Sequence, residues 1–252
     1  MRKQLPLTLL FLLTLIHAQA QQPDTAVAPS KAYKNIVRYN LSGPILFGFN
    51  YLVFGYERIL KPNQSMSMNI GQASLSNVKS FSTDSVSMSK SGKNSGFNFS
   101  LDYRFYLSKE NKYPAPHGVY VGPYYSYNRF NRNTDWKLKN SSAGNEFSVD
   151  SRIDIHTIGA EMGYQFVLWK DRMVLDFVLI GPGISNYKIS AELDGNINAS
   201  QKDQILDAVQ QLLTQKFPGM DYAIGDEKFD ASGNISSWNT GFRYLIHIGF
   251  RF

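Results

Sequence analysis

Apolar and polar residues alternate along most of this 252-residue chain. Successive side chains of an extended strand point to opposite faces, so this alternation predicts strands with one apolar face. The clearest case is the end of the chain. From Phe242 to Phe252 the even positions are apolar or aromatic, and the odd positions, apart from Leu245, are small or charged. The stretch 97–107 has the same pattern.

Eight such strands are predicted, separated by turn residues. They cover residues 36–47, 51–60, from 65 onward, 97–107, from 119 onward, 147–168, 173–184 and 238–252. The serine-rich stretch 76–95 is polar, yet Val86 and Met88 still alternate with serines. We therefore expect the strands beside it to continue there as a ribbon.

Two irregularities interrupt the alternation. Pro123 lies inside the fifth strand, where it cannot donate to a strand ladder, so it predicts a bulge or a local weak point. In the sixth strand the apolar residues occupy odd positions up to Ile155 and even positions from Ile158. This change of phase predicts a β-bulge near Thr157.

The connections between the strands alternate in length. Those after the second, fourth and sixth strands are compact, whereas those after the third, fifth and seventh are long and polar. The long ones, 76–95, 134–146 and 191–232, are the candidate surfaces for an external partner. Short turns on one side and longer loops on the other are typical of bacterial membrane barrels.

One segment has helical rather than strand periodicity. Residues 200–216 form a predicted helix with Ser200 as its cap. Its apolar stripe consists of Ile205, Val209, Leu212 and Leu213. A surface helix that packs on its own loop is the simplest interpretation. A lid, a partner-binding element or an interfacial membrane helix are the alternatives.

The N-terminus has the three parts of a secretory signal peptide. Arg2 and Lys3 precede an apolar core from Leu5 to Ile16, and a small-residue cleavage site follows it. We expect residues 1–20 to be removed and residues 21–34 to form a periplasmic linker. The chain contains no cysteine, which excludes a lipid-anchored lipoprotein and a disulfide scaffold.

Charge and composition exclude several classes of protein. Loss of Arg2 and Lys3 with the signal peptide lowers the formal charge from +6 to +4, which is too little to argue for nucleic acid. Beyond the signal peptide, no apolar run is long enough for a transmembrane helix. The 15 Tyr and 17 Phe residues suit short strands with aromatic girdles.

The alternating final strand that ends on Phe252 resembles the closing strand of bacterial outer-membrane β-barrels. With the strand count, it makes the chain similar to the small eight-stranded outer-membrane β-barrel protein family of Gram-negative bacteria. The resemblance implies an all-β, up-and-down antiparallel transmembrane barrel over residues 35–252, a monomer in the cell outer membrane, surrounded by its lipid. It also implies a C-terminal insertion signal, read by the barrel assembly machinery, at Tyr244, Ile246, Ile248, Phe250 and Phe252.

The inward face of this barrel is predicted to carry charges that cancel. They are Arg38, Glu57, Asp102, Arg104, Glu161, Asp176, Arg243 and Arg251. An eight-stranded barrel has just enough interior for its side chains, so we expect these residues to pair in layers and to close the lumen. His247 faces the same interior, where a hydrogen-bonded structural histidine is expected.

The function predicted from these patterns is a non-enzymatic barrel that stabilises the envelope or binds a partner through its loops. A barrel enzyme that modifies outer-leaflet lipid is the alternative, with His156 as the weak catalytic candidate. A secreted, lipocalin-like ligand-binding barrel is a second alternative, but the many inward glycines argue against it. The sequence has no metal-ligand spacing, Walker loop or dinucleotide fingerprint, so no cofactor is expected.

Overall fold

The computed structural model describes residues 33–252, except 49, 76, 77, 79, 140–145, 196 and 218. The predicted signal peptide and residues 21–32 of the predicted linker lie outside the described residues, as does the predicted loop tip at 140–145.

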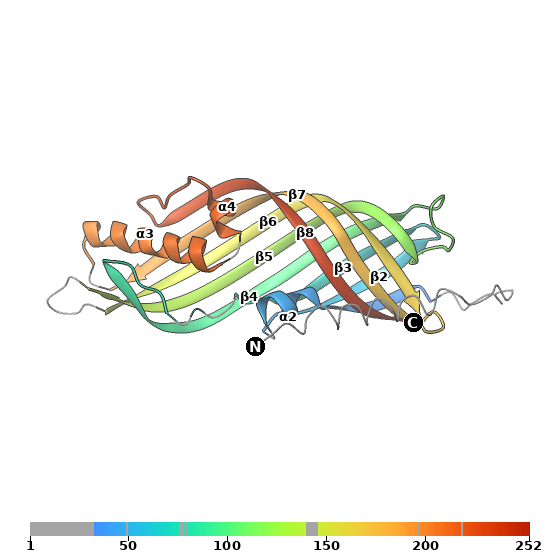
Figure 1. The fold of residues 1–252 in the computed structure, drawn as a ribbon, viewed down its shortest axis with the longest axis horizontal. Coiled ribbons are helices and arrows are strands. Elements are labelled where there is room, and N and C mark those ends of the chain that lie inside the picture. The colour runs from blue at the N-terminus through green and yellow to red at the C-terminus, as the bar shows by residue number, and fades with distance from the viewer. Residues whose placement is uncertain are drawn as a thin grey trace, which may run out of the picture. The chain divides into compact units, whose positions relative to one another are not determined.

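Eight antiparallel strands close into a ring, in which each strand pairs with the next and the last pairs with the first (Figure 1). They are β1 (Asn35–Asn40), β2 (Leu52–Lys61), β3 (Gln64–Gln72), β4 (Val86–Tyr106), β5 (Gly118–Leu138), β6 (Glu146–Leu168), β7 (Met173–Asp194) and β8 (Asn234–Arg251). The number, order and antiparallel pairing of the predicted strands are therefore confirmed.

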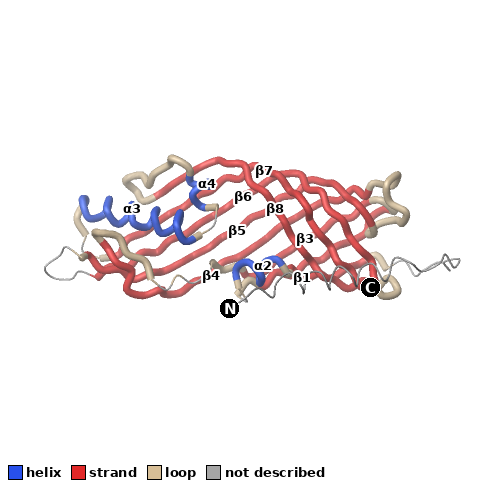
Figure 2. Tube along the Cα trace, viewed as in Figure 1, coloured by secondary structure: helices blue, strands red, loops and turns tan. Residues whose placement is uncertain are grey.

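The later strands are much longer than the first three. β1 to β3 have 6 to 10 residues, whereas β4 to β8 have 18 to 23. The long strands therefore run past the end of β3 as an open sheet (Figure 2). We call this part the extension; by register it comprises residues 86–96, 130–138, 146–153, 189–194 and 234–235. The predicted ribbon is thus confirmed, and much of the predicted loops 76–95 and 134–146 is strand.

Among the described residues, three helices accompany the strands: α2 (Ser42–Phe47), α3 (Ala199–Lys216) and α4 (Met220–Ile224). The last two belong to the connection between β7 and β8 and lie against the extension (Figure 1). All four residues of the predicted apolar stripe of α3 are buried. Among the described residues, no helix is long and apolar enough to cross a membrane.

The cap of α3 differs from the prediction. The side chain of Asn198 accepts a hydrogen bond from the Gln201 backbone N–H, and the side chain of Gln201 accepts one from the Asn198 backbone N–H. This reciprocal pair satisfies two backbone donors of the first turn, so the helix begins before Ser200.

The predicted first strand, 36–47, is wrong beyond Asn40, because α2 follows. The side chain of Asn40 accepts the backbone N–H of Gly43 at 3.0 Å and turns the chain. Pro44 then falls in the first turn of α2, where its missing N–H costs nothing, whereas in a strand it would break the ladder.

Neither predicted irregularity lies where the sequence places it. The pairing of β5 with β6 is continuous through both Pro123 and Thr157, and Pro123 points outward. The register instead shifts between Val178 and Gly181 of β7, where Leu179 and Ile180 are both exposed. The apolar residues of β6 change phase because the environment changes, since odd positions face inward along its whole length.

That environment is inverted between the two halves of the molecule. In the ring most inward residues are charged or polar, with aliphatic exceptions such as Ile36 and Val174, and most outward residues are apolar. In the extension the inward residues form an apolar core with α3 and α4, as at Trp136, Val149 and Ile189. On β6, the outward positions Asp150 and Arg152 in the extension are exposed and charged, whereas Ile158 and Met162 in the ring are exposed and apolar.

Candidate functional site

A cluster of seven charged side chains fills the ring interior, and we call it the charged cluster. Its members come from β1, β2, β4, β6, β7 and β8: Arg38, Glu57, Asp102, Arg104, Glu161, Asp176 and Arg243. Strand alternation directs all of them to the same side of the sheet, and closure of the ring brings them together. Six of the side chains have no exposed surface, and that of Arg243 is 9% exposed.

Arg104 joins the parts of the charged cluster. Its guanidinium group lies 2.9 Å from the carboxylate of Asp102 and 3.0 Å from that of Asp176. Glu57 and Glu161 lie farther away, each at 3.7 Å. Paired charges of this kind are tolerable inside a protein, whereas an isolated one is not.

Two further arginines complete the pairing on opposite sides of Arg104. Arg38 contacts Glu57 at 3.4 Å and Asp176 at 3.1 Å. Arg243 contacts Asp102 at 3.2 Å and Glu161 at 3.3 Å. Arg104 thus links the pairs made by Arg38 to the pairs made by Arg243.

Neutral side chains make further hydrogen bonds to several groups of the cluster. The Tyr120 hydroxyl donates to Asp176 at 2.8 Å. The Tyr106 hydroxyl lies 3.1 Å from Glu57 Oε1 and 2.8 Å from Gln165 Oε1, and Arg104 also donates to Gln165 Oε1, at 2.9 Å. The result is a continuous polar network across the ring.

Glycine makes room for the tyrosines of this network. A Cβ atom on Gly163 of β6 would lie 2.4 Å from the Tyr120 hydroxyl oxygen and 2.5 Å from the Phe177 carbonyl oxygen. No side chain fits between those atoms. Gly163 is therefore an inward glycine at a place where space is tight.

Two further residues predicted inside the ring are not members of the charged cluster. Arg251 is buried, but the hydrogen bond described for it goes to the Tyr33 carbonyl oxygen at 3.1 Å, and no ion pair between described residues links it to the cluster. His247 is buried against Asp176, with 3.1 Å between its Nδ1 and the carboxylate. It thus occupies the structural position expected from the sequence.

His156 lies on the outer surface, away from the charged cluster. Its Nδ1 is 2.9 Å from the Tyr125 hydroxyl, and its ring stacks on Tyr127 with 4.6 Å between centroids. Nearby, Asp154 accepts a hydrogen bond from Tyr127 and pairs with Arg129. These contacts place His156 among outward tyrosines, and the described contacts include no serine that it could activate.

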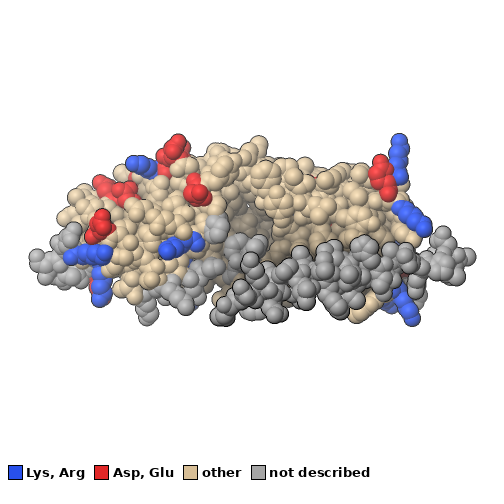
Figure 3. Space-filling model, in the orientation of Figure 1, with Lys and Arg blue, Asp and Glu red and all other residues tan. Residues whose placement is uncertain are grey.

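The outside of the ring is a belt of apolar side chains. Each exposed member is a strand residue with an outward position, such as Phe54, Met68, Ile158, Leu179 and Phe242. The belt also contains the predicted insertion residues Tyr244 and Phe250, exposed by 58% and 52%. On the face drawn in Figure 3, charged side chains lie at the two ends, and the described surface between them carries none.

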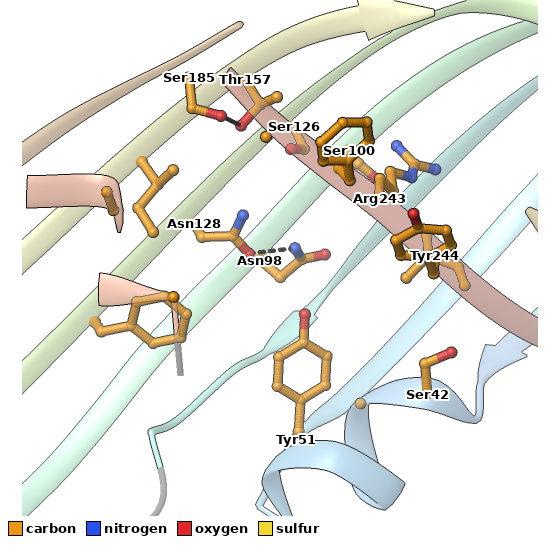
Figure 4. A pocket seen from close by; sticks show the side chains of 18 of the residues that line it. Ser42, Tyr51, Asn98, Ser100, Ser126, Asn128, Thr157, Ser185, Arg243 and Tyr244 are labelled. Atoms are coloured by element: carbon orange, nitrogen blue, oxygen red, sulfur yellow. Dashed lines mark hydrogen bonds between the residues drawn. The ribbon is translucent and has the colours of Figure 1, made fainter. Parts of the chain in front are cut away.

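A cavity of about 710 Å³ lies inside the molecule between the charged cluster and the helices α3 and α4. Arg243 and His247 line it on the side of the cluster, while Phe130, Phe217 and Met220 line it on the side of the helices. Polar side chains lie between, among them Asn98 and Asn128, joined by a hydrogen bond (Figure 4).

The charged cluster and the cavity have different chemical capacities. The cluster is a buried network in which every charged side chain makes an ion pair with another member. Among the described residues, no group of His, Cys, Asp and Glu side chains is arranged to hold a metal ion. The cavity has the volume of an ordinary ligand pocket and combines polar and apolar walls.

Comparison with known proteins identifies a resemblance but no family. No family model and no curated protein sequence matches the chain. A solved structure, that of a major outer membrane protein from Thermus thermophilus, matches with 10% identity and a TM-score of 0.34, over 87% of this chain and 98% of that one. At this level of similarity the match is distant, and the function has to be argued from the chain itself.

Sequence reasoning located the charged residues but missed several of their neutral partners. Gln165 has the same odd parity on β6 as Glu161, so the alternation alone could have placed it inside. The cavity had no such signal, because its walls come from separate parts of the chain. They are formed by strand residues, by α2, by Leu75 and by residues between Lys216 and Ala223.

Proposed function

We propose that the chain is an integral outer-membrane protein whose ring spans the lipid as a plugged barrel and whose extension stands outside the cell. The observation that carries this proposal is the inversion of polarity between ring and extension. Hydrocarbon surrounds apolar outward side chains, whereas water surrounds charged ones. The outward face of the ring therefore suits hydrocarbon, and the outward face of the extension suits water.

The dimensions of the belt support the same placement. On β6 the apolar or small outward positions run from Ile158 to Leu168, a stretch of eleven residues. A tilted transmembrane strand needs about 9 to 11 residues. The short turns at Pro62 and at 169–172 then lie in the periplasm, and α3 lies on the external side.

The interior argues against a general pore. Side chains of the charged cluster contact one another from six strands and close the ring at that level. A soluble ligand-binding barrel of lipocalin type would need its apolar face inward at the ring, which is the opposite arrangement. The proposed role is therefore an anchored platform, with an extension that supports the envelope or binds an external partner.

Cysteine labelling in intact cells tests the topology, since the natural chain contains no cysteine. Ser190→Cys lies in the extension and Lys170→Cys in a short turn. A membrane-impermeant maleimide is expected to label Ser190→Cys in intact cells and Lys170→Cys only after lysis. Labelling of both before lysis, or recovery of the protein in the soluble fraction, would contradict the proposal.

Planar-bilayer recording tests the plug. The purified protein is expected to give no sustained conductance at moderate voltage. A large, stable, porin-like current from the wild-type protein would contradict the closed interior while leaving the topology intact.

A further inference from the structure

The cavity above the charged cluster opens sideways, at the level of the apolar belt. Besides inward residues, Phe242 and Tyr244 line it, and these point outward from β8 with 64% and 58% of their surface exposed. Ser42 and Gly43 of α2 line the other side. The hollow near the middle of the face in Figure 3 agrees with such an opening.

The shortness of β1 produces this opening. The last residue pair between β1 and β8 is Asn40 with His247. Two further hydrogen bonds follow this pair. The Leu41 backbone N–H donates to the Ile246 carbonyl oxygen at 2.8 Å, and the Ile246 backbone N–H donates to the Ser42 hydroxyl oxygen at 2.7 Å. Among the described residues, β1 and α2 make no backbone pair with β8 beyond Ile246. Unpaired backbone at membrane depth is tolerated where it lines a cavity. The unpaired edge of β8 beyond Ile246 lies at such a cavity.

The cavity is polar at one end and apolar at the other. Its middle carries amide and hydroxyl groups, including Asn98, Asn128, Ser126 and Thr157, which Figure 4 labels. Its outer end is lined by Leu75, Phe130, Ile155, Phe217 and Met220. Such a gradient matches a molecule with one polar and one apolar part.

Unpaired hydrogen-bonding atoms of two side chains point to where the polar part binds. The Nε and Nη1 atoms of Arg243 and the Nε2 atom of His247 are buried and have no hydrogen-bond partner among the described residues. Both side chains line the cavity, and His247 is 1% exposed. Buried hydrogen-bonding groups left unpaired are unfavourable, so a ligand that accepts from the Arg243 guanidinium group and donates to His247 Nε2 would be held there.

The charged cluster at one end of the cavity favours a ligand with an uncharged head group. The charged cluster contains four carboxylates and three guanidinium groups in mutual contact. A further carboxylate or phosphate would meet net negative charge at short range. A neutral hydroxyl or carbonyl oxygen accepts from Arg243, and a hydroxyl group donates to His247 Nε2, without that repulsion.

We propose that this cavity binds a single-chain amphiphile with an uncharged, oxygen-bearing head, which enters from the membrane between β8 and α2. The head lies against Arg243 and His247, and the chain lies under α3 and α4 among the apolar residues. The inference rests on the proposed membrane placement of the ring. It adds a ligand site to the proposed role as an anchored platform.

Photo-labelling in proteoliposomes tests the site. The full-length mature protein is reconstituted with a diazirine-bearing monoacylglycerol in the bilayer, irradiated and mapped by mass spectrometry. Labels are expected at Phe130, Ile155 and Phe217, and excess monooleoylglycerol is expected to suppress them. Excess oleate, hexadecane or glycerol is expected to suppress them far less, because each lacks the neutral head or the chain.

Two variants locate the effect within the cavity. Ser126→Trp fills the middle of the cavity, whereas Ser236→Trp places the same ring on an exposed position of β8 outside it. The first is expected to reduce labelling by about tenfold or more, and the second to leave it unchanged. Arg243→Met, if its heat-modified gel shift shows a folded ring, is expected to weaken competition by monooleoylglycerol by about tenfold.

The outcomes separate this inference from the proposed function. Labels confined to belt residues such as Met162 and Leu179, or unchanged labelling of Ser126→Trp, would overturn the ligand site while the protein remained inserted. Failure of the wild-type protein to enter liposomes at all would overturn the membrane placement as well.

Discussion

The guanidinium group of Arg104 lies 3.0 Å from the carboxylate of Asp176, and neither side chain has any exposed surface. Arg38, Tyr120 and His247 also contact this carboxylate. Asp176 is thus a shared partner of two buried arginines, and the closure of the ring places it there.

Removal of Asp176 is therefore expected to be costly. Asp176→Ala would leave Arg38 and Arg104 short of a buried counter-charge, which lowers the free energy of unfolding by about 3 to 5 kcal/mol. Urea titration in detergent micelles measures the change. The control is Asp154→Ala, whose partner Arg129 is 45% exposed, with an expected loss below about 1 kcal/mol. Equal losses in both variants would contradict the buried network.

The inverted polarity predicts a position-dependent effect of added charge along one strand. Met162→Arg puts a cation on the outward belt of β6 and is expected to reduce stability in a bilayer by about 2 to 4 kcal/mol. Asp150→Arg, on the same face in the extension, is expected to change it by less than about 1 kcal/mol. Folding titrations into lipid vesicles compare the two, and equal tolerance would mean that the membrane boundary is misplaced.

Gly163→Ala is expected to disturb the polar network through Tyr120. The added methyl group has no room beside the Tyr120 hydroxyl and the Phe177 carbonyl oxygen, and such overpacking costs about 1 to 3 kcal/mol. Gly241→Ala is the matched control, since the nearest atom to its Cβ is Ser185 Oγ at 3.1 Å. Thermal unfolding of the two variants is the measurement, and an unaffected Gly163→Ala variant would refute the tight fit.

The apolar core of the extension predicts that α3 depends on its buried stripe. Val209→Asp places a carboxylate at a position that is 1% exposed and is expected to detach the helix, with a loss of several kcal/mol. Gln211→Asp, on the exposed side of α3, serves as the control. Limited proteolysis between residues 195 and 233 reports detachment, and equal resistance of both variants would argue against the docking of α3.

Deletion of residues 244–252 is expected to abolish membrane assembly. These residues include every position of β8 that pairs with β1, so the ring loses its closure and exposes strand edges that hydrocarbon cannot satisfy. The resemblance to outer-membrane barrels also makes Phe252 part of an insertion signal. Cell fractionation with a gel-shift assay measures the result, and normal levels of folded membrane protein would refute it.

The sequence by itself determined the strands, their faces and the inward charges, because alternation is a local property with a period of two residues. It also determined the helix around Val209, whose periodicity is equally local. It misplaced the end of the first strand, since Asn40 and Pro44 favour a helical turn that an alternation count does not detect.

Only the tertiary structure decided what each face meets. The phase change near Thr157 is a change of environment rather than a bulge, because the same inward side of β6 faces charges in the ring and α3 in the extension. The partners of Arg104, the bulge beside Ile180 and the cavity beside Arg243 likewise depend on ring closure and strand length. These features join residues far apart in the chain, and no local pattern encodes their distance in space.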